Sequence, residues 1–167
     1  MIGYMLGRYP ARLWGALGLV SAIAGGVAPA HAQSLTPGET LAHERSVMAG
    51  SFALARLEVW QKRLNLQSWD ISVVVARACD LRPKTAGNVH WYPEKKSAVI
   101  RVLDPADYKL PFAAVLEDIE FTVLHELVHL EMAPVLSDLH RTEANRAEEE
   151  HAVNQMTEAL LKLDRGK

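Results

Sequence analysis

The stretch FTVLHELVHL, residues 121–130, decides the fold, because it sets polar side chains at helical spacing inside an apolar run. His125 and His129 are four residues apart, so in a helix of about 3.6 residues per turn their imidazoles lie on one face. Together they supply half of a zinc site, which takes four ligands. Glu126 stands between them, where the pattern H-E-x-x-H puts a carboxylate that can accept a proton from metal-bound water. The stretch therefore predicts two zinc ligands and a catalytic base.

The flanks of this motif are apolar on nearly every side, as expected for a helix in the centre of a domain. Burying two histidines and a glutamate in an apolar core costs free energy unless they have a partner, and this favours a bound cation. The alternative is a pair of satisfied core histidines that happen to be four residues apart. We expect this helix to run from about Pro111 to Met132 and to end because of Pro134, which lacks a backbone donor.

The first 32 residues have the composition of a secretory signal peptide. Arg8 and Arg12 precede an apolar run over residues 13–27, and the segment closes with Ala30-His31-Ala32. We expect cleavage after Ala32, a short tether over residues 33–38 and a single domain over residues 39–167. An uncleaved anchor is the alternative, but the glycines make the run short for a membrane span. The prediction is a bacterial periplasmic or secreted protein without stable membrane insertion after cleavage.

The remaining 135 residues (167 minus 32) are enough for one domain. They carry 16 basic and 20 acidic side chains, a formal charge of −4, which does not indicate a nucleic-acid partner. Cys79 is the single cysteine, so zinc sites built from several cysteines are excluded. Composition leaves the oligomeric state open.

Sequence patterns predict an α+β fold around the motif helix. A Thr36-Pro37 start and apolar residues at helical spacing predict a helix to about Leu64, with Gly50 a potential break. Runs rich in β-branched residues predict strands over 69–76, 88–92 and 97–103, the last two joined by a hairpin turn over 93–96. A final helix is expected over about 142–163. The expected domain is an N-terminal helix, a three-stranded sheet with an edge hairpin, the motif helix and a C-terminal helix.

The C-terminal helix must supply the third metal ligand. Glu149 falls near the middle of its apolar stripe, one turn before Val153, whereas Glu148 and Glu150 lie about 100° to either side. A carboxylate directed into the core needs a cation to offset its desolvation. Periodicity therefore favours Glu149 as the third ligand, with Glu150 as the alternative. An ordinary solvated acidic face is the remaining interpretation of this run.

The residues HELVHL, followed on a second helix by a glutamate, resemble the gluzincin branch of the zincin metallopeptidases, especially their minimal single-domain members. The resemblance covers about residues 69–163, and the spacing of twenty residues from His129 to Glu149 is similar to that of thermolysin-like enzymes. The metzincin extension is not present, since Met132 and Val135 occupy its glycine and histidine positions. Val153 stands where thermolysin-like enzymes have an acidic residue. Asp138 or a backbone carbonyl is therefore expected to orient the histidines.

The resemblance implies an exported zinc metallopeptidase that hydrolyses bonds in a peptide or protein substrate, with Glu126 as general base. It also implies that His90 and Tyr92 lie on a strand bordering the cleft, as candidate oxyanion donors or substrate contacts; ordinary surface positions are the alternative. Other candidate donors are Tyr108, His140 and His151. The rival hypotheses are a catalytically silent zincin-like metal- or partner-binding module of the cell envelope, and a metal-free domain with a coincidental motif.

Overall fold

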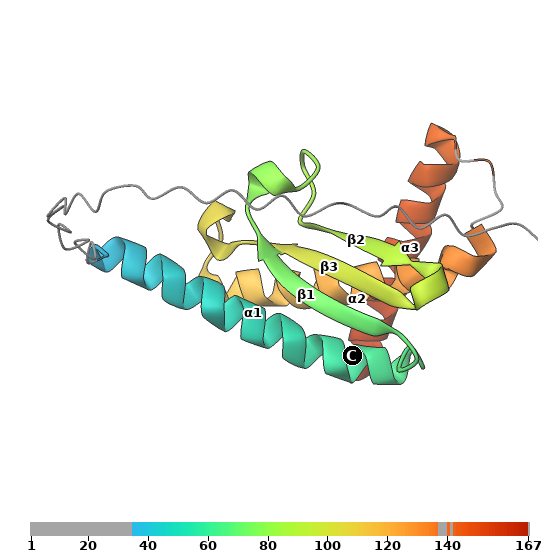
Figure 1. Cartoon of the computed structure of the whole chain (residues 1–167), viewed down its shortest axis with the longest axis horizontal. Coiled ribbons are helices and arrows are strands. Elements are labelled where there is room, and N and C mark those ends of the chain that lie inside the picture. The colour runs from blue at the N-terminus through green and yellow to red at the C-terminus, as the bar shows by residue number, and fades with distance from the viewer. Residues whose placement is uncertain (1–34, 137–139, 141, 167) are drawn as a thin grey trace, which may run out of the picture. The chain divides into compact units, whose positions relative to one another are not determined.

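Residues 35–136, 140 and 142–166 are described by the structure, a computed structural model. The signal peptide predicted over residues 1–32 and Asp138 lie outside this part of the chain. The described residues form an α+β domain of three long helices and a three-stranded mixed sheet, which confirms the predicted class (Figure 1). No helix among them combines the length and apolar character needed to cross a membrane. The elements are α1 (Pro37–Arg63), β1 (Asp70–Ala76), η1 (Ala78–Asp80), β2 (Gly87–Tyr92), η2 (Pro93–Lys95), β3 (Ser97–Leu103), η3 (Pro105–Asp107), α2 (Phe112–Leu136) and α3 (Glu143–Asp164).

Helix α1 begins where the capping pattern predicts. The Thr36 hydroxyl accepts a hydrogen bond from the Glu39 backbone N–H at 3.3 Å, and the Glu39 carboxylate accepts one from the Thr36 N–H at 2.8 Å. These two bonds satisfy backbone donors that the first helical turn leaves free. The helix then runs unbroken through Gly50, which lies close to Val75 of β1. The potential break at Gly50 is therefore not used, and α1 covers one side of the core as a single helix.

The sheet has the order β1-β3-β2, with β3 parallel to β1 and antiparallel to β2 (Figure 1). The predicted strands and hairpin are confirmed, and Lys96 closes the hairpin turn with a left-handed φ of 46°. Alternation along β3 buries Ala98, Ile100 and Val102 against the helices. Because β2 lies at one edge, its outer backbone groups are not used by a neighbouring strand.

Strand β2 approaches α2 closely at its first residue. A Cβ atom at Gly87 would overlap both the Thr122 side chain of α2 and the Arg101 carbonyl oxygen of β3. A glycine therefore fits this position, where two backbones and a helix side chain meet. The close approach brings the free edge of β2 next to the helix that carries the histidine motif.

Helix α2 forms the centre of the core, as the apolar flanks of its motif predict. Ile119, Val123, Leu124 and Leu127 have no exposed surface. The prediction that Pro134 ends this helix is wrong, because α2 continues to Leu136. Proline lacks its own backbone donor but has a φ compatible with a helix, so the residues that follow it in the last turn keep helical backbone.

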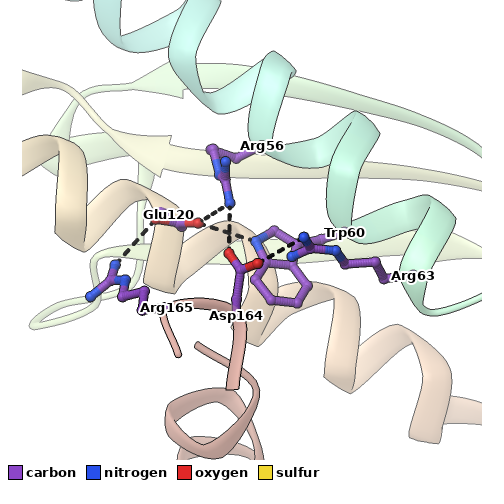
Figure 2. Close-up of polar contacts among 6 residues, drawn as sticks. All are labelled: Arg56, Trp60, Arg63, Glu120, Asp164 and Arg165. Atoms are coloured by element: carbon purple, nitrogen blue, oxygen red, sulfur yellow. Dashed lines mark hydrogen bonds and ion pairs between the residues drawn. The ribbon is translucent and has the colours of Figure 1, made fainter. Parts of the chain in front are cut away.

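A buried carboxylate on α2 joins it to α1 and to the end of α3 (Figure 2). The Glu120 side chain is only 10% exposed and pairs with Arg56 of α1 and, at 3.2 Å, with Arg165, the residue after α3. The Trp60 indole N–H donates to the same carboxylate at 3.3 Å. Three donors thus compensate a charge that is largely removed from water.

Asp164, the last residue of α3, extends this network. Its carboxylate pairs with Arg63 at 2.7 Å and with Arg56 at 3.5 Å, as Figure 2 shows. The hydrogen bond from Arg63 lowers the pKa of Asp164 below its ordinary value. These contacts fix the C-terminal end of α3 against α1 and α2, and so help to set how α3 is rotated about its own axis.

Replacing Glu120 is expected to destabilise the domain. Glu120→Gln keeps the shape of the side chain but leaves Arg56 and Arg165 without their carboxylate, so we expect the free energy of unfolding to fall by about 2 kcal/mol. Urea unfolding measures this change. The control is Glu158→Gln, which removes an exposed pair with Lys162 and should cost less than about 0.5 kcal/mol. Equal losses in the two variants would contradict a special role for Glu120.

Candidate metal centre

Three side chains from α2 and α3 converge on one point. The Nε2 atoms of His125 and His129 lie 3.0 Å apart, and Glu150 Oε2 lies 3.3 Å from the first and 3.5 Å from the second. The imidazoles meet because the residues are one helical turn apart on α2, as the sequence predicts. Among the described residues, these three form the group of side chains able to hold a metal ion.

The spacing of these atoms fits a tetrahedral ion. Ligands bound to zinc at about 2.0–2.1 Å in tetrahedral geometry are about 3.3 Å apart. The three distances in the cluster, from 3.0 to 3.5 Å, bracket that value. Burial, and next the charge of His129, lower the pKa of His125, which favours the neutral imidazole that metals bind. Donor type, number and spacing therefore agree with a metal site.

Glu149 lies elsewhere in this arrangement. Its Oε1 is 3.0 Å from His129 Nδ1, the ring nitrogen on the far side from the Nε2 cluster. Its side chain is 11% exposed, against 53% for Glu150, so Glu149 is the less exposed of the two carboxylates. The carboxylate that faces the core thus lies behind His129, whereas Glu150 on the rim reaches the paired Nε2 atoms. The structure brings the alternative residue, Glu150, to the cluster in place of Glu149.

Glu126 is buried beside the cluster and faces the same cleft. Burial, with a smaller contribution from the charge of Glu150, raises the pKa of the Glu126 carboxyl to about 8. A hydrogen bond from the Val89 backbone N–H of β2 and the positive charge of Arg82 act in the opposite direction. The carboxyl group is therefore held at the strand edge by a backbone donor, in an environment that favours proton uptake.

A cleft of about 950 Å³ opens in front of these residues. One face of α2 forms its floor, and the edge of β2, the segment 82–86 before it, and α3 form its walls. We call this space the cleft; it is lined by Arg82, Lys84, Thr85, Ala86, Gly87, Asn88, Val89, His90, Trp91, Arg101, Asp118, Phe121, Thr122, His125, Glu126, His129, Arg146, Glu149, Glu150 and Asn154.

His90 lines the cleft, but Tyr92 is not among the described residues that do so. Their rings contact each other at 4.8 Å, because residues two apart on a strand share one face. Val89 and Trp91 on the opposite face pack against the core. The His90 and Tyr92 side chains therefore lie on the outer face of the sheet, and His90 borders the cleft from that face.

The remaining candidate donors also lie outside the lining of the cleft. The Tyr108 hydroxyl donates to Asp118 at 2.6 Å, and burial raises the pKa of this phenol. His151 contacts Gln155 on the exposed side of α3. Among the described residues, the structure brings none of the predicted oxyanion donors except His90 to the cleft.

Sequence reasoning missed two asparagines. The Asn154 side chain forms a hydrogen bond with His125, and it lies one turn after Glu150 on α3, a spacing that could have indicated it. Asn88 of β2 has a buried Oδ1 without a hydrogen-bond partner in the described part of the chain, and it lines the cleft. Sequence alone offered no signal for Asn88. His125 Nδ1 likewise has no partner among the described residues.

An ion pair fixes the chain between β1 and β2, just before residues 82–86, which form one wall of the cleft. Arg77 donates to both oxygens of Asp107, at 2.8 and 2.6 Å, and the Ala78 backbone N–H donates to the same carboxylate at 2.7 Å. A little further on, the Thr85 N–H and hydroxyl both donate to the Arg82 carbonyl, at 3.2 and 2.8 Å. These bonds hold the chain as it enters β2.

The contribution of Asp107 to stability should disappear in acid. The hydrogen bond from Arg77, followed by that from Ala78, lowers the pKa of Asp107 from 3.8 to about 2. Since the folded state binds this proton less readily than the unfolded state, the stabilisation is complete above about pH 5 and is lost as pH falls towards 2. Urea unfolding of the wild type and of Asp107→Asn should differ at neutral pH, and the difference should narrow below about pH 4 and close only near pH 2. Arg77→Gln should reduce this pH-dependent difference to the part that depends on the Ala78 N–H; a gap that is independent of pH would contradict the assignment.

Comparison with known proteins does not identify a relative: no family model, curated protein or solved structure matches the chain. What the fold and the site define is a small α+β domain with a His-His-Glu cluster and a buried glutamate on one cleft. The functional argument therefore depends on these residues.

Proposed function

We propose that this chain is an exported zinc-dependent metallopeptidase. The observation that carries the proposal is the convergence of His125 Nε2, His129 Nε2 and Glu150 Oε2 within 3.5 Å, next to the buried Glu126. Zinc is the preferred metal because two imidazoles and one carboxylate, with room for a further ligand, are typical of catalytic zinc sites. Export is proposed from the N-terminal segment alone, which resembles a signal peptide.

In this proposal His125, His129 and Glu150 hold the ion. A bound Zn²⁺ supplies Lewis acidity, and it lowers the pKa of a coordinated water to about 7. Glu149 orients the His129 ring through Nδ1 and keeps Nε2 free to ligate. Asn154 contacts His125 from α3, but not through Nδ1, which has no partner among the described residues.

Glu126 accepts a proton from the attacking water and passes it to the leaving amine. The Val89 N–H keeps its carboxylate at the edge of β2, and a divalent cation nearby opposes the rise in its pKa. The outer edge of β2 borders the cleft, where its free backbone groups are available to an extended peptide. Acid-base chemistry and substrate alignment are thus assigned to adjacent residues.

A second candidate function is a metal- or partner-binding module without catalysis. One observation favours it: His90 and Tyr92 lie on the outer face of the sheet, so neither aims an oxyanion donor at the cluster. Metal binding alone does not distinguish this function from a peptidase.

Two measurements on the purified protein test these proposals. Elemental analysis is expected to find stoichiometric zinc, and a peptide library is expected to be cleaved in a way that a chelator abolishes and added zinc restores. Zinc without cleavage would favour the binding module. A protein free of metal, whose properties do not respond to zinc or chelator, would contradict both functions.

A further inference from the structure

Four basic residues line the cleft and have no ionic partner among the described residues. Arg82 and Lys84 belong to the segment before β2, Arg101 to β3 and Arg146 to α3. The described arginines outside the cleft behave differently, because each has a partner in the structure. These are Arg45, which stacks over the Phe112 ring, and Arg56, Arg63, Arg77 and Arg165, which pair with carboxylates.

The carboxylates of the cleft are engaged elsewhere. Asp118 accepts the Tyr108 hydroxyl, Glu126 accepts the Val89 N–H, and Glu149 and Glu150 contact the histidines. Arg101 lies on the outer face of the sheet, across from Asn88, so three basic side chains and a bound divalent ion (+5) face four carboxylates (−4), which leaves a net charge of +1 around the cluster. Such a cleft attracts anionic ligands.

Arg82 and Lys84 are the best placed of the four to select a ligand. Both are exposed, and the hydrogen bonds from Thr85 to the Arg82 carbonyl fix the turn between them. Arg82 is near enough to Glu126 for its charge to act on that carboxylate. A guanidinium and an ammonium in a fixed turn provide two separate sites for carboxylates, the first of them bidentate.

We infer that the cleft selects peptides that carry aspartate or glutamate next to the bond to be cut, and that Arg82 and Lys84 are the specificity-determining residues. This inference rests on the proposed peptidase function, which makes a peptide the ligand of the cleft. The substrate class is acidic peptide. Arg82 and Lys84 recognise the side-chain carboxylates of the peptide, while the edge of β2 contacts the peptide backbone.

Binding is measured separately from cleavage. The full chain with Glu126→Gln, loaded with zinc, is titrated into two fluorescent eight-residue peptides that differ only in having two glutamates or two glutamines. We expect about tenfold tighter binding of the glutamate peptide at low salt, with the difference shrinking as salt rises. Adding Arg82→Glu and Lys84→Glu should abolish or reverse this preference.

The matched control changes the same amount of charge outside the cleft. Lys95→Glu with Lys96→Glu, in the hairpin turn, should keep the preference, since neither residue lines the cleft. If the charge-reversed cleft variant does not fold, as judged by stoichiometric zinc binding, Arg82→Gln with Lys84→Gln replaces it and should bring the two affinities together.

The outcomes separate this inference from the proposed function. Equal affinity for the two peptides, binding of neither, or a preference that survives the cleft substitutions would overturn the inference. Wild-type enzyme that cleaves both peptides with equal kcat/KM would also overturn it, while the peptidase function would stand. A glutamate preference in binding that depends on Arg82 and Lys84, without cleavage of either peptide or of the peptide library by the wild type, would sustain acidic-peptide recognition and favour the binding module over the peptidase.

Discussion

Glu126→Gln is expected to lower kcat by about 10²- to 10⁴-fold while the protein keeps its zinc, the range typical for loss of a general base. Glu126 is not part of the cluster of Nε2 and Oε2 atoms, so removing its charge leaves the metal ligands in place. Glutamine has nearly the same shape and can still accept the Val89 N–H through its amide oxygen. The variant loses only the capacity to take up and return a proton.

Zinc content and turnover must be measured on the same preparation. Glu131→Gln, an exposed residue of the same helix, is the matched control and should keep both. If Glu126→Gln lost zinc together with activity, Glu126 would be acting on the metal site itself. Retained turnover with zinc bound would show that another group, or water alone, manages the proton.

The fold could be predicted to a large extent because its signals are local. The β-branched run of β1, the Thr36 cap and the polar hairpin turn each act within a few residues. The sheet order depended on contacts that no local pattern records. The parallel pairing of Asp70 with Ser97 and the close approach of Gly87 to Thr122 place β2 at the edge, beside the motif helix.

In the candidate site, too, some positions follow from local sequence and others from tertiary contacts. His125, Glu126 and His129 follow from the geometry of a single helix, whatever surrounds it. The relation of Glu149 and Glu150 to them depends on how α3 is rotated against α2. Contacts at the other end of α3, between Glu120 and Arg165 and around Asp164, contribute to that rotation. Periodicity identifies which carboxylate is buried, but a buried carboxylate can face either nitrogen of an imidazole.

Glu150→Ala is expected to cost more zinc affinity than Glu149→Gln. Removing a direct ligand should weaken binding by more than about 100-fold, whereas loss of a carboxylate that orients a ligating histidine typically costs about 10- to 100-fold. The expectation follows from position: Glu150 Oε2 lies within 3.5 Å of both Nε2 atoms, and Glu149 Oε1 contacts Nδ1 of His129. Competition with a chromophoric zinc chelator measures the zinc dissociation constants of the wild type and the two variants. Glu148→Ala, which alters an exposed neighbour outside the cluster, should leave affinity unchanged.

Cobalt substitution separates a ligand from a residue that supports one. The visible spectrum of Co²⁺ depends on the atoms bound to it and on their geometry, so replacing an oxygen donor with nitrogen changes the spectrum. Glu150→His should bind cobalt with an altered spectrum, because the new imidazole can take the place of the carboxylate. Glu149→Gln should bind cobalt more weakly but with the wild-type spectrum, since the donor atoms are the same. The opposite result, an altered spectrum for Glu149→Gln and an unaffected one for Glu150→His, would assign the third ligand to Glu149, as periodicity alone favours.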